Sequence, residues 1–329
     1  MVAGRRKVVP GLVLLCLGAL LARSLSVLIG INELLLAIAL GAVLVNTVGI
    51  PERFRHGTAT YNIWLAAGIV LLGSSLTVGM IIEVGATVLL LLVAAVTLTL
   101  VTVEVLARNV AGVTDRFGSL LAAGAGICGV SAVAAVGGAV RAKEMHIAYA
   151  AGVVLLVDAV TIVVYPIVGA VLDLPDVVFG VWAGVSMLST GPVVAVGFAH
   201  SEVAGQWATI TKLARNALIG VVALGYASYY ARRGAGGSTS VRMLWENFPK
   251  FVLGFLVLVG LASLGAFSPA QQDMISTVVD WLFLLAFVGL GTQIRTAELR
   301  ATGITPALIV FAAVLLVSVL SLAAALVVL

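Results

Sequence analysis

Charged residues are scarce in this chain: only 10% of its 329 residues are charged, whereas 62% are hydrophobic. A soluble domain has roughly 25% charged and about 45–50% apolar residues. So few charges cannot cover a globule with a wettable surface, which excludes an ordinary soluble enzyme, and the apolar excess excludes a disordered chain. Cysteine and histidine are also rare, with two and three residues. Cys16 and Cys128 lie in apolar stretches without the spacing of disulfides or metal ligands, so we expect no metal and no cofactor.

Long apolar runs replace the missing charge. A membrane-spanning helix needs about 20 mostly apolar residues, and runs of this length recur along the whole sequence. They predict an all-α polytopic membrane protein in which residues 1–329 form a single transmembrane transporter domain. The eleven expected spans are 9–24, 30–49, 58–77, 85–107, 117–139, 145–171, 177–199, 205–230, 248–267, 275–292 and 304–328.

Most Lys and Arg residues fall in short loops that share one side if the N-terminus is cytoplasmic. This bias predicts a multi-pass protein of the bacterial inner membrane with a cytoplasmic N-terminus. The net charge of +4 therefore indicates membrane orientation and not nucleic-acid binding. A stretch rich in Gly and Ser at about 231–246 is expected to be a flexible cytoplasmic loop between two structural halves. The expected partners are the lipid bilayer and a small anion, and a homodimer is compatible with this picture.

An internal repeat is suggested by residues 73–100 and 291–318, which align without gaps and share identities such as Gly73 with Gly291 and Thr87 with Thr305. The third and tenth spans, which contain these segments, are separated by an odd number of spans. Equivalent helices would therefore run in opposite directions, which is the inverted-repeat arrangement of secondary transporters.

Two expected spans contain helix-breaking sequences, at residues 124–131 and 184–192. Glycine and proline lower the cost of interrupting a helix. In lipid, broken backbone is tolerated only where protein or a wet cavity satisfies it. The N–H groups at the start of a half-helix can then bind an anion. The alternative is close helix packing through small residues.

Charged residues inside the spans are candidates for chemistry. Lys212 and Arg215 share a helical face and either turn towards the broken spans or snorkel to the headgroups. Asp158 lies in the middle of a span, where a carboxylate pairs with a cation or keeps its proton. Glu104 precedes Arg108 by four residues, which predicts a helical ion pair. The predicted substrate site comprises Gly126, Cys128, Gly129, Ser131, Ser186, Ser189, Thr190, Lys212 and Arg215, with Asp158 as the coupling group.

At these same residues the chain resembles the YeiH-like family of bacterial inner-membrane proteins, also labelled as sulfate exporters. The motifs that carry the resemblance are 126–132, 141–144, 165–166, 179–184 and 208–215. The resemblance implies a secondary carrier for sulfate or a related sulfur oxyanion. It also implies inverted repeats with two broken, crossed helices, similar to the sodium/proton antiporter and bile-acid transporter folds.

The chain departs from the family pattern at the second break. There the family usually has His, an acidic residue and Gln, whereas this chain has Leu188, Ser189 and Pro192. The family usually has a small uncharged residue at the position of Asp158. Either the acidic group has moved across the cavity, or the substrate or coupling ion has changed.

We therefore expect a secondary transporter that moves a small inorganic or organic oxyanion, sulfate-like or a sulfonate, by alternating access with proton coupling. A cation/proton antiporter that uses Asp158 is the main alternative, and a channel is another. A membrane-embedded enzyme is disfavoured because no nucleophile–base pair or acidic metal site is visible in the spans.

Overall fold

The computed structural model describes residues 2–233, 249–297 and 304–329, and no β-strand occurs in these ranges. The chain divides into two compact units. Unit 1 comprises Met1–Val84 and Lys250–Thr296, and unit 2 comprises Gly85–Pro249 and Ala297–Leu329. The flexible loop expected at about 231–246 lies outside the described residues from position 234 onwards.

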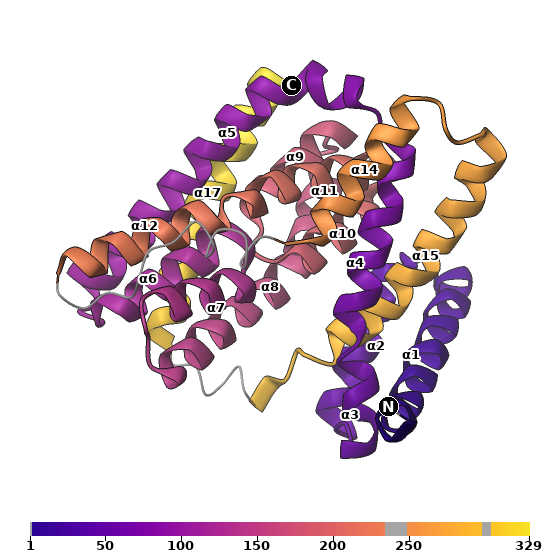
Figure 1. Ribbon diagram of the computed structural model, residues 1–329, viewed down its shortest axis with the longest axis horizontal. Helices are drawn as coiled ribbons and strands as arrows, with labels where there is room; N and C mark the ends of the chain where they lie inside the picture. Colours follow the sequence, from indigo (N-terminus) through magenta and orange to yellow (C-terminus); the bar gives the residue numbers. More distant parts are fainter. Residues whose placement is uncertain (1, 234–248, 298–303) are drawn as a thin grey trace. The chain divides into compact units, whose positions relative to one another are not determined.

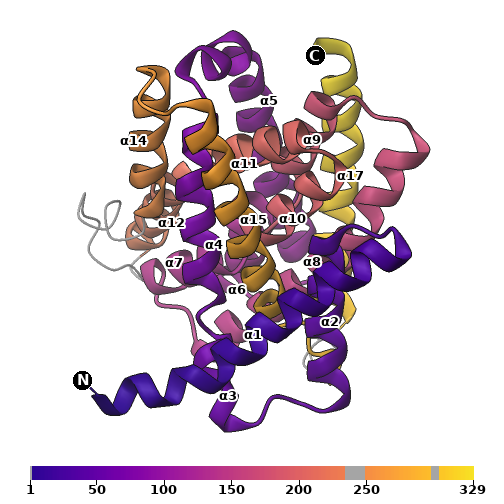
Figure 2. The same ribbon diagram turned by 90° about the vertical axis from the view of Figure 1, so that its right-hand side faces the viewer.

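Unit 1 combines helices from two separated stretches of the chain. They are α1 (Val2–Ile29), α2 (Glu33–Thr47), α3 (Glu52–Thr58), α4 (Tyr61–Leu72), the 3-10 turn η1 (Gly73–Ser75), α14 (Phe251–Ser263) and α15 (Pro269–Gly291). α15 packs against α2 and α4, which ties the later stretch to the earlier one (Figures 1 and 2). Glycine allows this close approach, because a Cβ on Gly41 of α2 would meet the Cα of Gly291 at 3.0 Å.

Unit 2 contains the predicted functional residues. Its elements are α5 (Val78–Val105, within the unit from Gly85), the π-helical turn η2 (Leu106–Val110), α6 (Asp115–Ala123), the π-helical turn η3 (Gly124–Cys128), α7 (Val130–Ala139), α8 (Glu144–Val171), α9 (Asp176–Ser186), α10 (Thr190–His200), α11 (Glu202–Ala217), α12 (Ile219–Arg232) and α17 (Ile304–Val328). Buried, mostly small side chains of α6, η3, α7 and α8 pack together with residues of α12 and α17 in its core. Small side chains let these helices approach closely, and they hold the interrupted segments in place.

Six helices of the described residues are long and apolar enough to cross a membrane. They are Val8–Ile29, Gly85–Val110, Glu144–Val171, Glu202–Arg232, Pro269–Gly291 and Ile304–Val328. This finding supports the all-helical, polytopic prediction, whereas the expected count of eleven spans stays a prediction. The other expected spans correspond to shorter helices or to interrupted ones such as α9 and α10.

Both helix-breaking sequences coincide with interruptions. η3 ends at Cys128, and Gly129 then adopts φ +69° and ψ −133° before α7 begins. This positive φ favours glycine, because a Cβ would be strained there. The second break runs from the end of α9 at Ser186 to the start of α10 at Thr190, and Met187 and Ser189 are extended.

The orientation of α5 and α17 agrees with an inverted repeat. Thr87, near the start of α5, and Leu329, at the end of the chain, line the same cavity, so the two helices run antiparallel (Figure 1). In the sequence alignment Thr87 is equivalent to Thr305, which lies at the opposite end of α17. Each repeated segment also starts in unit 1 and ends in unit 2. The repeat itself stays a prediction that these directions support.

Candidate functional site

The ammonium group of Lys212, on α11, lies where η3 and α9 end. Its Nζ donates hydrogen bonds to the carbonyl oxygens of Ile127 at 2.8 Å, Met187 at 2.9 Å and Leu188 at 2.5 Å. An ammonium group has three donors, so each has an acceptor here. The last carbonyls of a helix have no partner within the helix, and Lys212 supplies partners to two such helix ends at once.

Arg215, one turn further along α11, binds the same two helix ends. Its Nε donates to Gly126 O at 2.8 Å, and its Nη1 donates to Val185 O and Met187 O, both at 2.7 Å. Its Nη2 donates to Ala125 O at 2.5 Å. Carbonyl groups at a helix C-terminus carry partial negative charge, so the guanidinium neutralises both ends and holds them together.

Neither cation snorkels to the headgroups, because 0% of Lys212 and 1% of Arg215 is exposed. That alternative is wrong: both side chains point inwards to backbone carbonyls. The contacts observed for these two residues are with helix ends and not with an open cavity. A direct contact with a substrate stays a prediction, and the visible role of both residues is to position the broken helices.

Each break is followed by a new helix, α7 after the first and α10 after the second. The N-termini of these two helices also lie close together. A Cβ placed on Gly129 would collide with the side chain of Ser189, so the two helix starts lie against each other. The first intrahelical hydrogen bonds are donated by Ala132 in α7 and Val193 in α10. The N–H groups before those positions precede the helical bonding pattern and give this region positive potential.

The carboxylate of Asp158, on α8, lies at this positive end. Its Oδ1 accepts the backbone N–H of Ser189 at 3.1 Å, and the residue is 3% exposed. Among the described residues, no hydrogen-bond partner contacts its Oδ2 and no Lys or Arg forms an ion pair with it. A buried carboxylate oxygen without a partner is costly, and a bound proton or cation would remove that cost.

Asn216 belongs to this site although the sequence analysis did not identify it. Its Nδ2 donates to the hydroxyl of Thr190 at 3.0 Å, and its Oδ1 is buried without a partner in the described part of the chain. The signal was its position four residues after Lys212, which places both on one face of α11.

The structure does not gather all the predicted site residues. Gly129, Ser189, Thr190 and Asp158 come together at the two helix starts, and Ser131 is exposed in the first turn of α7. Cys128 is buried at the end of η3, close to the carbonyls of the positioned helix ends.

Ser186 is directed elsewhere. Its hydroxyl donates to Trp182 O at 2.5 Å and accepts from the hydroxyl of Tyr165 at 2.8 Å. The ring of Trp182 stacks on that of Tyr165, and its Nε1 donates to Ser318 O at 2.9 Å. Ser186 is therefore part of an aromatic network that packs α9 against α8 and α17.

Comparison with known proteins identifies the family. Residues 10–310 match the family described as Conserved hypothetical protein 698. A UPF0324 membrane protein of Nitratidesulfovibrio vulgaris is 33% identical over 96% of this chain and 92% of its own length. A UPF0324 membrane protein of Clostridium tetani is 31% identical over 78% of each chain. UPF0324 membrane protein TauZ of Paracoccus pantotrophus is 29% identical over 89% of this chain and 88% of its own.

No solved structure matches the chain. These relatives are named membrane proteins, and the apolar helices of this chain agree with that description. The chain is a multi-pass membrane protein that belongs to the UPF0324 family, the YeiH-like family whose motifs surround its two helix breaks.

Proposed function

We propose that this protein is a secondary transporter that moves a small oxyanion, sulfate-like or an organic sulfonate, by alternating access. The observation that carries the proposal is the joining of two helix breaks in one unit, with Lys212 and Arg215 on their C-terminal ends and Asp158 at their N-terminal starts. Discontinuous helices that meet in this way form the substrate and ion sites of many secondary transporters.

The anion would bind at the starts of α7 and α10. Helix N-termini offer backbone N–H groups and positive potential to anions. Three hydroxyl groups can also reach a ligand there, because Ser131 is exposed and Ser189 and Thr190 are half-buried. None of these donors brings a fixed charge, so a ligand can be released as well as bound.

Lys212 and Arg215 would support this site through their contacts with the C-terminal ends of η3 and α9. Each contacts carbonyls of both broken segments, so they keep the two helix starts at a fixed separation. Their charge would also add to the positive potential that an anion meets, since potentials act over several ångströms in a medium of low dielectric constant.

Asp158 would couple a proton to the anion. Its carboxylate already occupies the Ser189 N–H, one of the donors that an oxyanion would use. A negative Asp158 therefore competes with the anion for the same positive helix start. Protonation of its Oδ2, which has no partner among the described residues, removes the repulsion, so proton and anion would move together in the same direction.

Labelled-sulfate counterflow in proteoliposomes tests the proposal. Proteoliposomes that contain the wild-type protein and are preloaded with unlabelled sulfate should accumulate labelled sulfate beyond equilibrium, because a carrier exchanges one anion for another. The Ser189→Ala, Thr190→Ala double variant should lose accumulation. Flux that does not saturate with sulfate and shows no counterflow would indicate a channel. No flux of sulfate or of small sulfonates by folded protein would reject the oxyanion proposal.

A cation/proton antiporter is the second candidate, and one observation favours it. Asp158 Oδ2 and Asn216 Oδ1 are both buried oxygen atoms without partners in the described ranges. The two side chains bind adjacent residues, Ser189 and Thr190. Oxygen ligands of this kind suit a hard monovalent cation. A Na⁺ gradient that drives proton movement in sulfate-free vesicles, and that fails to do so in Asp158→Asn, would select this candidate.

A further inference from the structure

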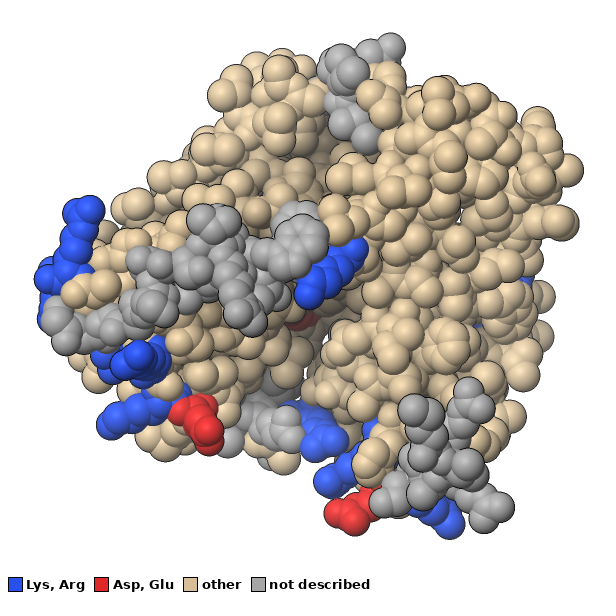
Figure 3. All heavy atoms as spheres, viewed as in Figure 1, with Lys and Arg blue, Asp and Glu red and all other residues tan. Residues whose placement is uncertain are grey.

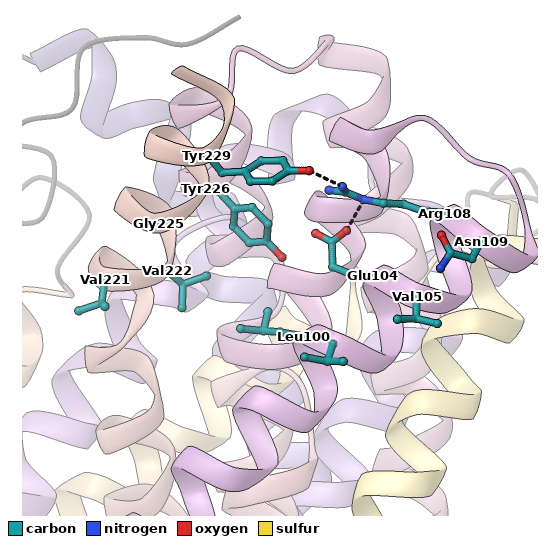
Figure 4. Close-up of a pocket in the computed structure, with 11 residues that line it drawn as sticks. Leu100, Glu104, Val105, Arg108, Asn109, Val221, Val222, Gly225, Tyr226 and Tyr229 are labelled. Atoms are coloured by element: carbon teal, nitrogen blue, oxygen red, sulfur yellow. Dashed lines mark hydrogen bonds and ion pairs between the residues drawn. The ribbon is translucent and has the colours of Figure 1, made fainter. Parts of the chain in front are cut away.

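Unit 2 contains a groove that is separate from the helix breaks. It lies between the second half of α5 with η2 and the outer face of α12 (Figure 4), and its volume is ≈ 630 Å³. Residues of α5 and α12 that repeat at intervals of about four line it, so each helix contributes one face. The apolar wall consists of Leu100, Val101, Val105, Val221, Val222 and Gly225.

The apolar wall is accessible from outside the protein. Val101 is 55% and Val221 is 61% exposed, and both lie in helices apolar enough to span a membrane. The lining residues of α5 and η2 extend from Leu100 to Arg108, and these eight residue steps rise about 12 Å along a helix axis. One leaflet of the hydrocarbon core is about 15 Å thick, so the groove accommodates most of an acyl chain.

One end of the groove is polar. Arg108 forms an ion pair with Glu104 at 2.5 Å, as its spacing predicts, and its Nη1 donates to the hydroxyl of Tyr229 at 3.1 Å (Figure 4). Asn109 and Tyr226 complete this end. Tyr side chains are typical of the membrane–water interface, where one end of the ring is apolar and the other is wet.

Positive charge is in excess beside this polar end. Arg233 lies over the ring of Tyr229, with 4.5 Å between its Cζ and the ring centroid. A neighbouring cavity is lined by Arg116, Lys143 and Arg233 around the single carboxylate of Asp115. Lys and Arg side chains gather over the part of unit 2 that contains α6, α7 and the end of α12 (Figure 3).

We propose that this groove binds an anionic phospholipid, with an acyl chain against α5 and α12 and the phosphate beside Arg108, Tyr229 and Arg233. Basic pockets next to spanning helices recognise anionic headgroups, and each Lys or Arg contributes about 1 kcal/mol near the surface. The apolar wall alone would accept any lipid chain. The excess of positive charge at the polar end selects the anionic headgroup.

Gly225 makes the proposal testable. A Cβ at Gly225 would meet no atom within 4 Å, so Gly225→Leu starts a side chain from an open position of the groove wall and removes a glycine from the interior of α12. Gly260 in α14 of unit 1 is equally open, and Gly260→Leu is the matched control. Arg233→Gln removes the charge beside Tyr229 and leaves the apolar wall intact.

The experiment reconstitutes the full chain in nanodiscs that contain equal amounts of phosphatidylglycerol and phosphatidylcholine, and then counts the lipids retained after mild detergent extraction by native mass spectrometry. We expect wild type and Gly260→Leu to retain phosphatidylglycerol in preference to phosphatidylcholine. Gly225→Leu should lose both retained lipids. Arg233→Gln should lower the preference for phosphatidylglycerol about 5-fold, which corresponds to roughly 1 kcal/mol.

Equal retention of the two lipids by wild type would overturn the proposal, and so would unchanged retention by Gly225→Leu. If Gly225→Leu instead converts a dimer into a monomer and leaves retained lipid unchanged, the groove is an interface with a second copy and the lipid assignment is wrong. Sulfate counterflow does not enter this test, so its outcome is independent of the proposed transport function.

Discussion

The carboxylate of Asp158 accepts the backbone N–H of Ser189 at 3.1 Å, and so joins the middle of α8 to the N-cap residue of α10. This contact places the Asp158 carboxylate at the positive end of the α10 helix dipole. On the other side of the same break, Lys212 binds the carbonyls of Met187 and Leu188. Side chains of opposite charge therefore bind the backbone groups on the two sides of this break. Mutation of each side chain should have a different effect.

Asp158→Asn should uncouple transport from protons and leave the fold intact. The amide keeps an oxygen for the Ser189 N–H but cannot take up a proton at this site. We expect sulfate counterflow to persist, whereas uptake driven by a pH gradient falls to the level of protein-free vesicles. Asp173→Asn is the control, since Asp173 has φ +47° in a loop and Asn tolerates this conformation. Gradient-driven uptake that survives in Asp158→Asn would exclude Asp158 as the coupling group.

Lys212→Met should destabilise the protein. The substitution keeps the apolar stem but leaves carbonyls of η3 and α9 without their ammonium donor, and removal of one buried charged partner typically costs about 3–5 kcal/mol. We expect a clear fall in the melting temperature of the purified protein and a low yield. Lys250→Met, outside the helices of unit 2, should have no such effect. A melting temperature equal to that of wild type would show that Lys212 does not hold the helix ends.

Gly129→Ala should disrupt the contact between the two helix starts. The new Cβ would collide with Ser189 and lie 3.1 Å from Cγ1 of Val154, and the φ of +69° adds strain. A residue with a Cβ held in such a sparsely populated backbone region costs roughly 1–3 kcal/mol. The Gly129→Ala, Ser189→Gly double variant relieves the collision but not the strain, so thermal unfolding should show partial recovery. Full recovery would mean that backbone conformation at Gly129 is unimportant.

Ser186→Ala should reduce stability without changing substrate affinity. The hydroxyl contacts Trp182 and Tyr165 within the aromatic network, and a neutral buried hydrogen bond contributes about 1 kcal/mol. We expect a small fall in melting temperature and an unchanged KM for sulfate. Ser189→Ala provides the contrast, since its hydroxyl lies at the helix starts and its loss should raise KM. A raised KM in Ser186→Ala would return Ser186 to the substrate site.

Local features of the sequence predicted much of what the structure contains. Apolar runs predicted the long helices, since a chain with so few charges must bury its backbone hydrogen bonds in helices to exist in lipid. Both interruptions coincide with clusters of Gly, Ser and Pro, because those residues set local backbone preferences. The Glu104–Arg108 ion pair followed from helical spacing alone, and Asp158 was recognisable as a charge too far from either helix end to reach water.

Only the tertiary structure decided what the charged residues contact. The sequence placed Lys212 and Arg215 on one face of α11 but could not show that this face meets backbone carbonyls of η3 and of the end of α9. Such contacts depend on the packing of three elements distant in sequence. For the same reason the sequence analysis did not identify Asn216 as a site residue. It also could not show that the Ser186 hydroxyl bonds to the aromatic network. Helices and their breaks are properties of short stretches, whereas the partner of a buried polar group is set by whichever distant segment packs against it.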